Sequence, residues 1–322
     1  MKPAAAMEFA ADPLHRIIIS PVLLMFFAVS GYLVTGSAIR TKSVSIFLLF
    51  RAFRIAPALI MEVTLSAMIL GPWLTEMTLA EYFGDPLFFR YFLNVLGGVQ
   101  FYLPGLFAQN PIPGIVNVNL WTLAPEFFCY AFMTAMIISK VIFSRMYFTL
   151  AGFLIFCCAI AYTLFRGGHF YNWLAVPDWK MLVLAFIVGC AAFHWNHRIV
   201  VSGRNALIAA LVACAVFAYL PSLIIPGLLA LTYIVIYLGT RRIYLPSFLR
   251  RGDYSYGIYL FGFPLQQTLV YFLPAEYRNG AVVLLFGLPL TLLFAVLSWN
   301  LVENPTLKLK AKLRPNASRA RR

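Results

Sequence analysis

Charged side chains are scarce in this sequence, and acidic ones are the scarcest. Asp, Glu, Lys and Arg make up 11% of the 322 residues, only 11 residues are acidic, and 62% are hydrophobic. A soluble globular domain carries about 25% charged residues, so the composition excludes that class. The apolar residues form runs of about 17–25, the length at which a helix crosses a bilayer. The sequence therefore predicts an all-α fold, a polytopic transmembrane helical bundle.

Patterned cysteines and histidines are missing as well. The five cysteines all lie inside apolar runs, which indicates small core residues instead of a disulfide framework or a metal site. His194 and His197 stand three residues apart, but no further ligand is near them in the sequence. No GxSxG, P-loop, GxGxxG or HExxH pattern occurs. We therefore expect no metal and no bound cofactor.

Nine apolar segments are predicted to span the membrane. They are 17–36, 55–74, 121–139, 147–165, 180–195, 205–220, 222–239, 256–273 and 281–300. The long region at about 75–120 is broken by Gly97, Gly98 and Pro104, so we expect an interfacial or re-entrant segment there. This gives three parts, an outer N-terminal segment 1–16, a membrane domain 17–303 and a basic tail 304–322.

Basic residues set the expected orientation of these spans. Of the 25 Lys and Arg residues, 19 fall on one side, which includes the C-terminal tail, and 6 on the other. Loops rich in Lys and Arg stay in the cytoplasm, so the C-terminus is expected there. The net charge of +14 is then a topology signal and an attraction to membrane lipid headgroups, and no nucleic-acid partner is expected.

Arg51 and Arg54 stand at the predicted cytoplasmic entrance of the second span. A spacing of three places both on one helix face. Two guanidinium groups there could bind phosphate or carboxylate groups bidentately, or they could only anchor the helix to lipid headgroups. Glu62 lies deeper near the same face, where an intramembrane carboxylate either faces a cavity or partner, or is tolerated in protonated form.

Glu126 raises a similar choice in the stretch VNLWTLAPEFFCY (118–130). Pro125 suits the first turn of a helix, and Glu126 would then be a first-turn anion that stabilises it. In a cavity the same carboxylate could be a general base or bind sugar hydroxyls. Asn119 and Trp121 belong to the same stretch, and Trp121 suits the membrane interface.

Two further stretches carry polar residues within predicted spans. Ser30 and Tyr32 flank Gly31, which permits close approach of another helix, so packing is the favoured interpretation. Ser255, Tyr256 and Tyr259 follow Asp253 at the start of the eighth span, and Gln266 and Gln267 lie deeper in it. Such residues line a cavity or make interhelical hydrogen bonds.

Five of these stretches, in this order, resemble the acyltransferase-3 family of integral membrane O-acyltransferases. They are FFAVSGYLVTGS (26–37), FLLFRAFRIAPAL (47–59), VNVNLWTLAPEFFCY (116–130), DYSYGIYLFGFP (253–264) and LSWNLVENP (297–305). The resemblance implies an acyl group, usually from acetyl-CoA, transferred to a hydroxyl of a bacterial surface glycan at the inner membrane. It also implies that Arg51 and Arg54, which match the family's RxxR motif, contact the phosphates of CoA. Glu126 matches the carboxylate of the LWTL-x-x-E motif, which favours the cavity role.

The sequence also departs from the family pattern. Gly262 stands where the family often has a His in its YLxHxP-like segment. The family usually has ten core spans, and the first, which carries an Arg and a His thought essential for transfer, has no counterpart among these nine. His15 lies in a polar segment and does not take that place. The resemblance thus implies a sequence that begins late or a truncated, inactive member.

The combined expectation is an O-acyltransferase that modifies an exopolysaccharide, a lipopolysaccharide or a similar glycan. Arg51 and Arg54 hold the donor in this hypothesis. Glu126, with Asn119 and Trp121, shapes the transfer site. The remaining polar residues support the cavity; they are Ser30, Tyr32, Ser255, Tyr256 and Tyr259. A transporter or flippase for a lipid-linked glycan would use the same cavity without acyl chemistry, and a truncated homologue would act as a partner subunit.

Overall fold

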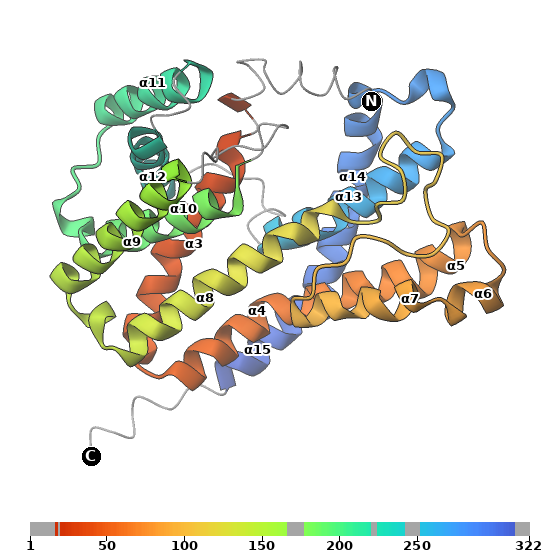
Figure 1. Ribbon diagram of the computed structural model, residues 1–322, viewed down its shortest axis with the longest axis horizontal. Helices are drawn as coiled ribbons and strands as arrows, with labels where there is room; N and C mark the ends of the chain where they lie inside the picture. Colours follow the sequence, from red (N-terminus) through yellow and green to blue (C-terminus); the bar gives the residue numbers. More distant parts are fainter. Residues whose placement is uncertain (1–16, 19, 166–176, 220–223, 242–251, 313–322) are drawn as a thin grey trace. The chain divides into compact units, whose positions relative to one another are not determined.

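The computed structural model in Figure 1 is built from helices. It describes residues 17–18, 20–165, 177–219, 224–241 and 252–312. Within these ranges the chain forms no strand, and a single antiparallel bridge joins Tyr102 to Ile115. The predicted outer segment 1–16, with His15, lies outside the described residues, as does the end of the basic tail from residue 313. The all-α prediction is confirmed.

A long helix coincides with each of the nine predicted spans in the described part of the chain. These are α3 (Ser20–Thr41), α4 (Val44–Leu65), α8 (Leu123–Ile138), α9 (Arg145–Phe165), α10 (Trp179–His194), α11 (Gly203–Tyr219), α12 (Ile224–Thr240), α13 (Ser255–Phe272) and α14 (Gly280–Ser298). Among the described residues, five helices are long and apolar enough to cross a membrane: Ser20–Thr41, Val44–Leu74, Val118–Ile138, Arg145–Tyr162 and Gly280–Leu309. The chain is thus an all-α polytopic membrane protein, and the number of spans stays a prediction.

The region between residues 75 and 117 contains only short helices. They are α6 (Leu79–Gly84), α7 (Pro86–Tyr91) and the 3-10 helix η2 (Phe92–Leu96). Thr78 and Glu81 form a reciprocal capping box at the start of α6, and Asp85 caps α7. Hydrogen bonds from the Thr78 hydroxyl and amide hold the pKa of Glu81 below its ordinary value. The expectation of an interrupted segment in place of a full span agrees with these short helices.

The second helix begins before the predicted second span, 55–74. It starts at Val44, so Arg51 and Arg54 lie inside the helix, and their place at the membrane entrance stays a prediction. Arg is a good helix former, and the residues before it are apolar, so nothing there ends a helix. The preceding break comes at Lys42, whose φ is 54°.

Two of the long helices continue through a π-helical turn. After α4 come the π-helix η1 (Ser66–Leu70) and α5 (Gly71–Leu74). After α14 come the π-helix η7 (Trp299–Glu303) and α15 (Asn304–Lys312). π-Helical turns are rare overall, and where they occur they are frequently found at functional sites.

The chain divides into two compact units, with boundaries inside α4 and α8. Unit 1 comprises 1–48 and 125–243, and unit 2 comprises 49–124 and 244–322. In unit 2, α13 and α14 lie side by side (Figure 1), and Gly257 approaches Ala295 between them.

In unit 1 the core is formed by close packing of α3 on α10. A Cβ atom added to Gly31 would overlap the carbonyl of Phe186, and one added to Gly189 would overlap the carbonyl of Ala28. Small residues let helix backbones approach this closely in membranes. The packing interpretation of Gly31 is thereby confirmed. The ring of Tyr32 packs edge-on against Phe193 with centroids 5.2 Å apart, and Ser30 is partly exposed.

Substituting Gly31 tests this packing. We expect Gly31→Ala to destabilise the protein by about 1–3 kcal/mol, because the added methyl group forces α3 and α10 apart. Gly239→Ala is the matched control, since that glycine also lies in a helix of unit 1 but has open space at its Cβ position. The control should gain up to about 1 kcal/mol from helix propensity. Thermal unfolding in detergent measures both, and equal stability of the two variants would contradict the close contact.

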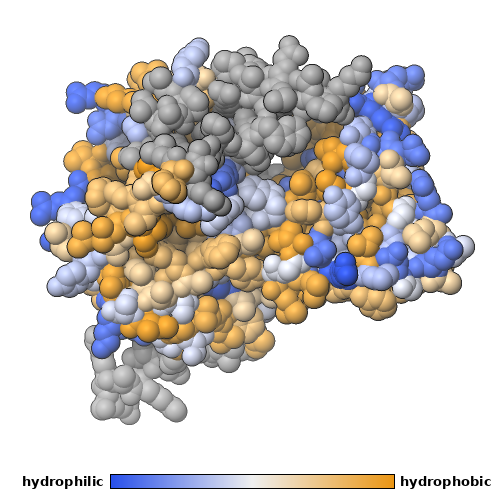
Figure 2. Space-filling model, in the orientation of Figure 1, coloured by the Kyte–Doolittle hydropathy of each residue, from blue (hydrophilic) through white to orange (hydrophobic). Residues whose placement is uncertain are grey.

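Apolar side chains cover exposed surfaces of both units. In unit 1 they gather along α9, where Met146, Leu150 and Phe153 are more than half exposed, as the orange surface in Figure 2 shows. In unit 2 Leu284 and Leu285 of α14 are exposed to a similar degree. Large exposed apolar surfaces are unfavourable in water, whereas contact with lipid tails is favourable for them.

Candidate functional site

A charged cluster in unit 2 surrounds Arg54. Its Nη2 atom lies 2.7 Å from Oδ2 of Asp253, and the other oxygen of that carboxylate accepts a 2.6 Å hydrogen bond from the Ser255 hydroxyl. The guanidinium carbon of Arg54 lies 6.0 Å from the ring centroid of Tyr256. The structure therefore brings Arg54, Ser255 and Tyr256 together. We call these residues, with Asp253 and Glu303, the Arg54 cluster.

Glu303 joins this cluster from the π-helix η7. Its side chain is buried, and its Oε1 atom accepts a 3.0 Å hydrogen bond from the Ser298 hydroxyl. It also interacts electrostatically with Arg54 and Asp253. The guanidinium of Arg54 thus has two acidic neighbours, Asp253 and Glu303. Arg51 precedes Arg54 by one helical turn, and its Nε atom is buried.

Sequence reasoning did not identify Asp253 and Glu303 as site residues. Both carboxylates lie in stretches that were singled out, 253–264 and 297–305. Their pairing with Arg54 was not predicted, because 199 residues separate Arg54 from Asp253. Acidic side chains are scarce in this chain, so each acidic residue of these polar stretches is a candidate partner for an arginine.

Asn119 and Tyr259 bind each other and join the 3-10 helix η3 (Val118–Thr122) to α13. The Asn119 amide donates to the Tyr259 carbonyl at 2.7 Å, and the Tyr259 hydroxyl donates to the Asn119 carbonyl at 2.9 Å. The Thr122 hydroxyl lies 2.8 Å from the same Tyr259 hydroxyl. This reciprocal pair fixes the start of the η3–α8 segment. Trp121, in the same turn, is partly exposed.

Glu62 is fully buried in unit 2 and has partners. Its Oε1 atom accepts hydrogen bonds from the Asn117 amide at 2.9 Å and from the Ser66 hydroxyl at 3.0 Å. Asn117 also donates to the Leu260 carbonyl at 2.9 Å. The buried Tyr91 side chain interacts electrostatically with the same carboxylate. Of the two interpretations of Glu62, the structure favours a group with partners over a merely tolerated one.

Asn117 connects α4, η3 and α13, so its removal should weaken unit 2. We expect Asn117→Ala to lower stability by about 1–3 kcal/mol, because Glu62 and the Leu260 carbonyl each lose a buried donor. Asn300→Ala is the control, since Asn300 is exposed and bonds only its own helix at Val296 in the described structure. Thermal unfolding of both variants in detergent gives the comparison. A loss for Asn300→Ala as large as for Asn117→Ala would refute this role.

Gln267 holds a loop against α13. Its Nε2 atom donates to the carbonyls of Ile112 and Ile115 at 2.8 and 2.6 Å, and its side-chain oxygen accepts from Asn110 at 3.1 Å. These bonds show that Gln267 secures backbone that has no helix of its own, whereas Gln266 is exposed. The choice between cavity lining and hydrogen bonding is decided for Gln267 in favour of hydrogen bonding.

Glu126 lies in unit 1 and is not at a free helix start. The 3-10 helix η3 runs directly into α8, and the Asn117 side chain caps it by accepting from the amide of Asn119 at 3.1 Å. Glu126 lies in the first turn of α8, but η3 precedes that turn without a break, so the first free amides of the combined helix lie near Val118 and not at Glu126. The Tyr130 hydroxyl donates a 2.5 Å hydrogen bond to the partly exposed Glu126 carboxylate. This geometry weighs against the interpretation of Glu126 as a helix-stabilising anion.

The histidines show no metal-binding arrangement where they are described. The ring of His194 packs on Phe148 with centroids 4.8 Å apart. Among the described residues, no group of three or more His, Cys, Asp and Glu side chains could hold a metal ion.

The comparisons with known proteins agree on one family. The family model described as an acyltransferase domain matches residues 15–300. An O-acetyl transferase of Shigella phage Sf6 is 28% identical over 298 residues, which cover 87% of this chain and 83% of that protein. Nodulation protein 10 of Rhizobium leguminosarum bv. viciae is 24% identical, with 91% and 84% covered. No solved structure matches. The chain therefore belongs to the acyltransferase-3 family, and it is an acyltransferase for groups other than aminoacyl groups.

Proposed function

We propose that this protein transfers an acetyl or other acyl group from acyl-CoA to a hydroxyl of an exopolysaccharide, a lipopolysaccharide or a related glycan. The observation that carries the proposal is the family match over 15–300 together with the similarity to an O-acetyl transferase. The protein works in the bacterial inner membrane, with residues 17–303 as its membrane domain and 304–322 as a cytoplasmic tail. Its partners are acyl-CoA, the glycan acceptor and membrane lipids.

The reaction exchanges a thioester for an oxygen ester. The acceptor hydroxyl oxygen attacks the thioester carbonyl carbon, so a C–O bond forms and the C–S bond breaks. The hydroxyl proton passes to a base, and the released CoA thiolate takes up a proton. Glu126 is the proposed base or hydroxyl-binding group. Its partial exposure and its hydrogen bond with Tyr130 support this role.

The donor is held by Arg51 and Arg54 in this proposal. Guanidinium groups bind phosphate oxygens bidentately, and CoA offers several phosphates. The side chain of Arg54 is 28% exposed, and its partner Asp253 is 51% exposed, so a ligand can reach the pair. Ser255 hydrogen-bonds Asp253, and Tyr256 lies beside the Arg54 guanidinium, so both support the proposed donor site. Asn119 and Tyr259 fix the η3–α8 segment, which carries Trp121 and leads to Glu126.

Radiolabelled acetyl-CoA tests the proposal directly. Membrane vesicles that contain the protein are incubated with the labelled donor, and label is followed into the glycan fraction. An O-acyltransferase leaves base-labile label on the glycan, and vesicles without the protein do not. A glycan that crosses the membrane without acquiring label would instead identify a transporter and refute the proposal.

A further inference from the structure

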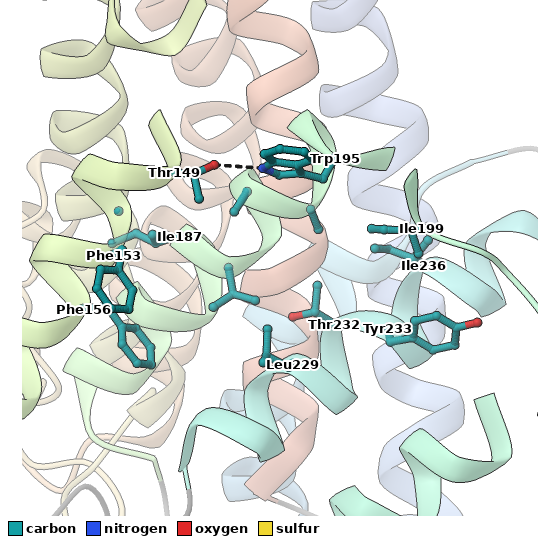
Figure 3. A pocket seen from close by; sticks show the side chains of 14 residues that line it. Thr149, Phe153, Phe156, Ile187, Trp195, Ile199, Leu229, Thr232, Tyr233 and Ile236 are labelled. Atoms are coloured by element: carbon teal, nitrogen blue, oxygen red, sulfur yellow. Dashed lines mark hydrogen bonds between the residues drawn. The ribbon is translucent and has the colours of Figure 1, made fainter. Parts of the chain in front are cut away.

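A cavity in unit 1 has no residue assigned to acyl transfer among those that line it. Its volume is about 600 Å³, and it opens between α9, α10 and α12 (Figure 3). The walls are mostly aliphatic and aromatic; they include Phe153, Phe156, Ile187, Leu229 and Ile236. We call it the α9–α12 pocket. An acetyl group has two carbons and would leave most of this volume empty.

The few hydroxyls that line the pocket are already bonded within the protein. Thr232 donates to the Leu228 carbonyl at 2.8 Å. The Tyr233 hydroxyl donates to the Val200 carbonyl at 2.7 Å, and Figure 3 shows it pointing away from the other labelled residues. A polar ligand would lose its hydration and find no free donor on these hydroxyls, so the pocket suits hydrocarbon.

One end of the pocket carries positive charge. Thr149 and Trp195 lie there, joined by a 2.9 Å hydrogen bond from the indole to the hydroxyl. The Arg145 guanidinium carbon lies 5.2 Å from the Trp195 ring centroid, and Thr149 donates back to the Arg145 carbonyl one turn below. Arg198 follows Trp195 by three residues. Both arginines are exposed.

The surroundings of the pocket identify the source of the hydrocarbon. Helix α9 is one of the candidate membrane spans, and α10 and α12 are shorter apolar helices. Arg145 is the first residue of α9, so the positive charge lies at a helix end and the apolar walls extend along the helix from it. An anionic phospholipid matches this arrangement, because its headgroup would lie at the positively charged end and its tail along the apolar walls.

We propose that the α9–α12 pocket binds a tail of an anionic phospholipid whose headgroup is held by Arg145 and Arg198. The bound lipid fills the space between α9 and the α10–α12 pair. No residue assigned to acyl transfer lines the pocket, so its occupation is measured without any assay of transfer.

Photolabelling tests this site. The full chain is reconstituted in vesicles that contain phosphatidylglycerol or phosphatidylcholine with a diazirine in the tail, and labelled peptides are identified by mass spectrometry. We expect phosphatidylglycerol to label residues that line the pocket, in α9, α10 and α12, more strongly than phosphatidylcholine. Arg145→Gln and Arg198→Gln should each reduce that preference about fivefold, because a Lys or Arg near anionic lipid contributes about that factor. The control Arg204→Gln changes an exposed arginine of α11, outside the pocket, and should leave the preference unchanged.

A second pair of variants separates pocket binding from general contact with lipid. Ala192 lines the pocket, so Ala192→Phe fills it and should remove most of the labelling there. Ala206→Phe makes the same change on α11, outside the pocket, and should not. Equal labelling by both lipids, or unchanged labelling in Ala192→Phe, would overturn the proposal.

Discussion

Glu126→Gln is expected to lower kcat about 10²–10⁴-fold while the protein stays folded. That range is the usual contribution of a positioned general base or acid. Glutamine keeps the size of the side chain and can still accept from the Tyr130 hydroxyl, which now lies 2.5 Å from the carboxylate. What glutamine cannot do is take up a proton from the acceptor hydroxyl. Steady-state transfer of labelled acetyl groups to the glycan measures the loss.

The alternative role of Glu126 makes a different prediction. If the carboxylate only stabilised the helix, Glu126→Gln would lower the free energy of unfolding by the small amount expected for a helix-end charge, about 0.3–1 kcal/mol, and leave kcat unchanged. The geometry argues against this, because η3 precedes α8 and Asn117 caps the combined helix eight residues before Pro125. Unfolding temperature and kcat should therefore be measured on the same preparation.

Two control variants are needed to interpret the kcat of Glu126→Gln. Tyr130→Phe removes the hydrogen bond to the carboxylate but leaves the carboxylate itself, so a smaller loss of kcat is expected than for Glu126→Gln. Glu276→Gln changes an exposed glutamate in the short 3-10 helix η6 (Ala275–Tyr277) and should be neutral. A Glu126→Gln protein with normal kcat, or a Glu276→Gln protein with an equal loss, would remove Glu126 from the transfer site.

The helices were predictable from the sequence because a long apolar segment in lipid must satisfy its backbone hydrogen bonds internally, as a helix does. Each predicted span coincides with a helix in the described structure. Helix α4 begins before the predicted span, at Val44, because the charge of the arginines at positions 51 and 54 does not end a helix. The π-helical turns η1 and η7 have no sequence signature that the apolar pattern could reveal.

The partners of the site residues were harder to predict than the residues themselves. Arg54 was singled out by its spacing from Arg51, but its pairing with Asp253 depends on how α4 packs against the start of α13. Glu62 was recognised as a buried carboxylate, yet its donor Asn117 is 55 residues away and lies in a turn between elements. The spacing of residues along the sequence predicts which side chains share a helix face. Their partners on other helices depend on tertiary packing, which the spacing does not reveal.

Arg54→Ala should raise the KM for acetyl-CoA about 10–100-fold, with a smaller effect on kcat. A hydrogen bond to a charged group contributes about 1.5–3 kcal/mol, and Arg54 is proposed to make such bonds to the phosphates of CoA. Arg51→Ala should act in the same direction. Initial rates at varied acetyl-CoA and saturating acceptor give KM and kcat separately.

A donor without phosphates distinguishes this role from a structural one. S-Acetylpantetheine carries the same thioester but none of the phosphates of CoA, so Arg54→Ala should change its kinetics little. If Arg54 instead served only to hold α4 to α13 through Asp253, its loss would impair both donors equally, and so would Asp253→Asn. The expected pattern is therefore a large effect of Arg54→Ala with acetyl-CoA alone.

Arg90→Ala, which removes an exposed arginine of α7, should affect neither donor. Because Asp253 already forms an ion pair with Arg54, Asp253→Asn should strengthen phosphate binding if the donor competes with that carboxylate for the guanidinium. A lower KM for acetyl-CoA in Asp253→Asn, beside a higher one in Arg54→Ala, would identify the Arg54 cluster as the donor site, and equal effects on both donors would exclude it.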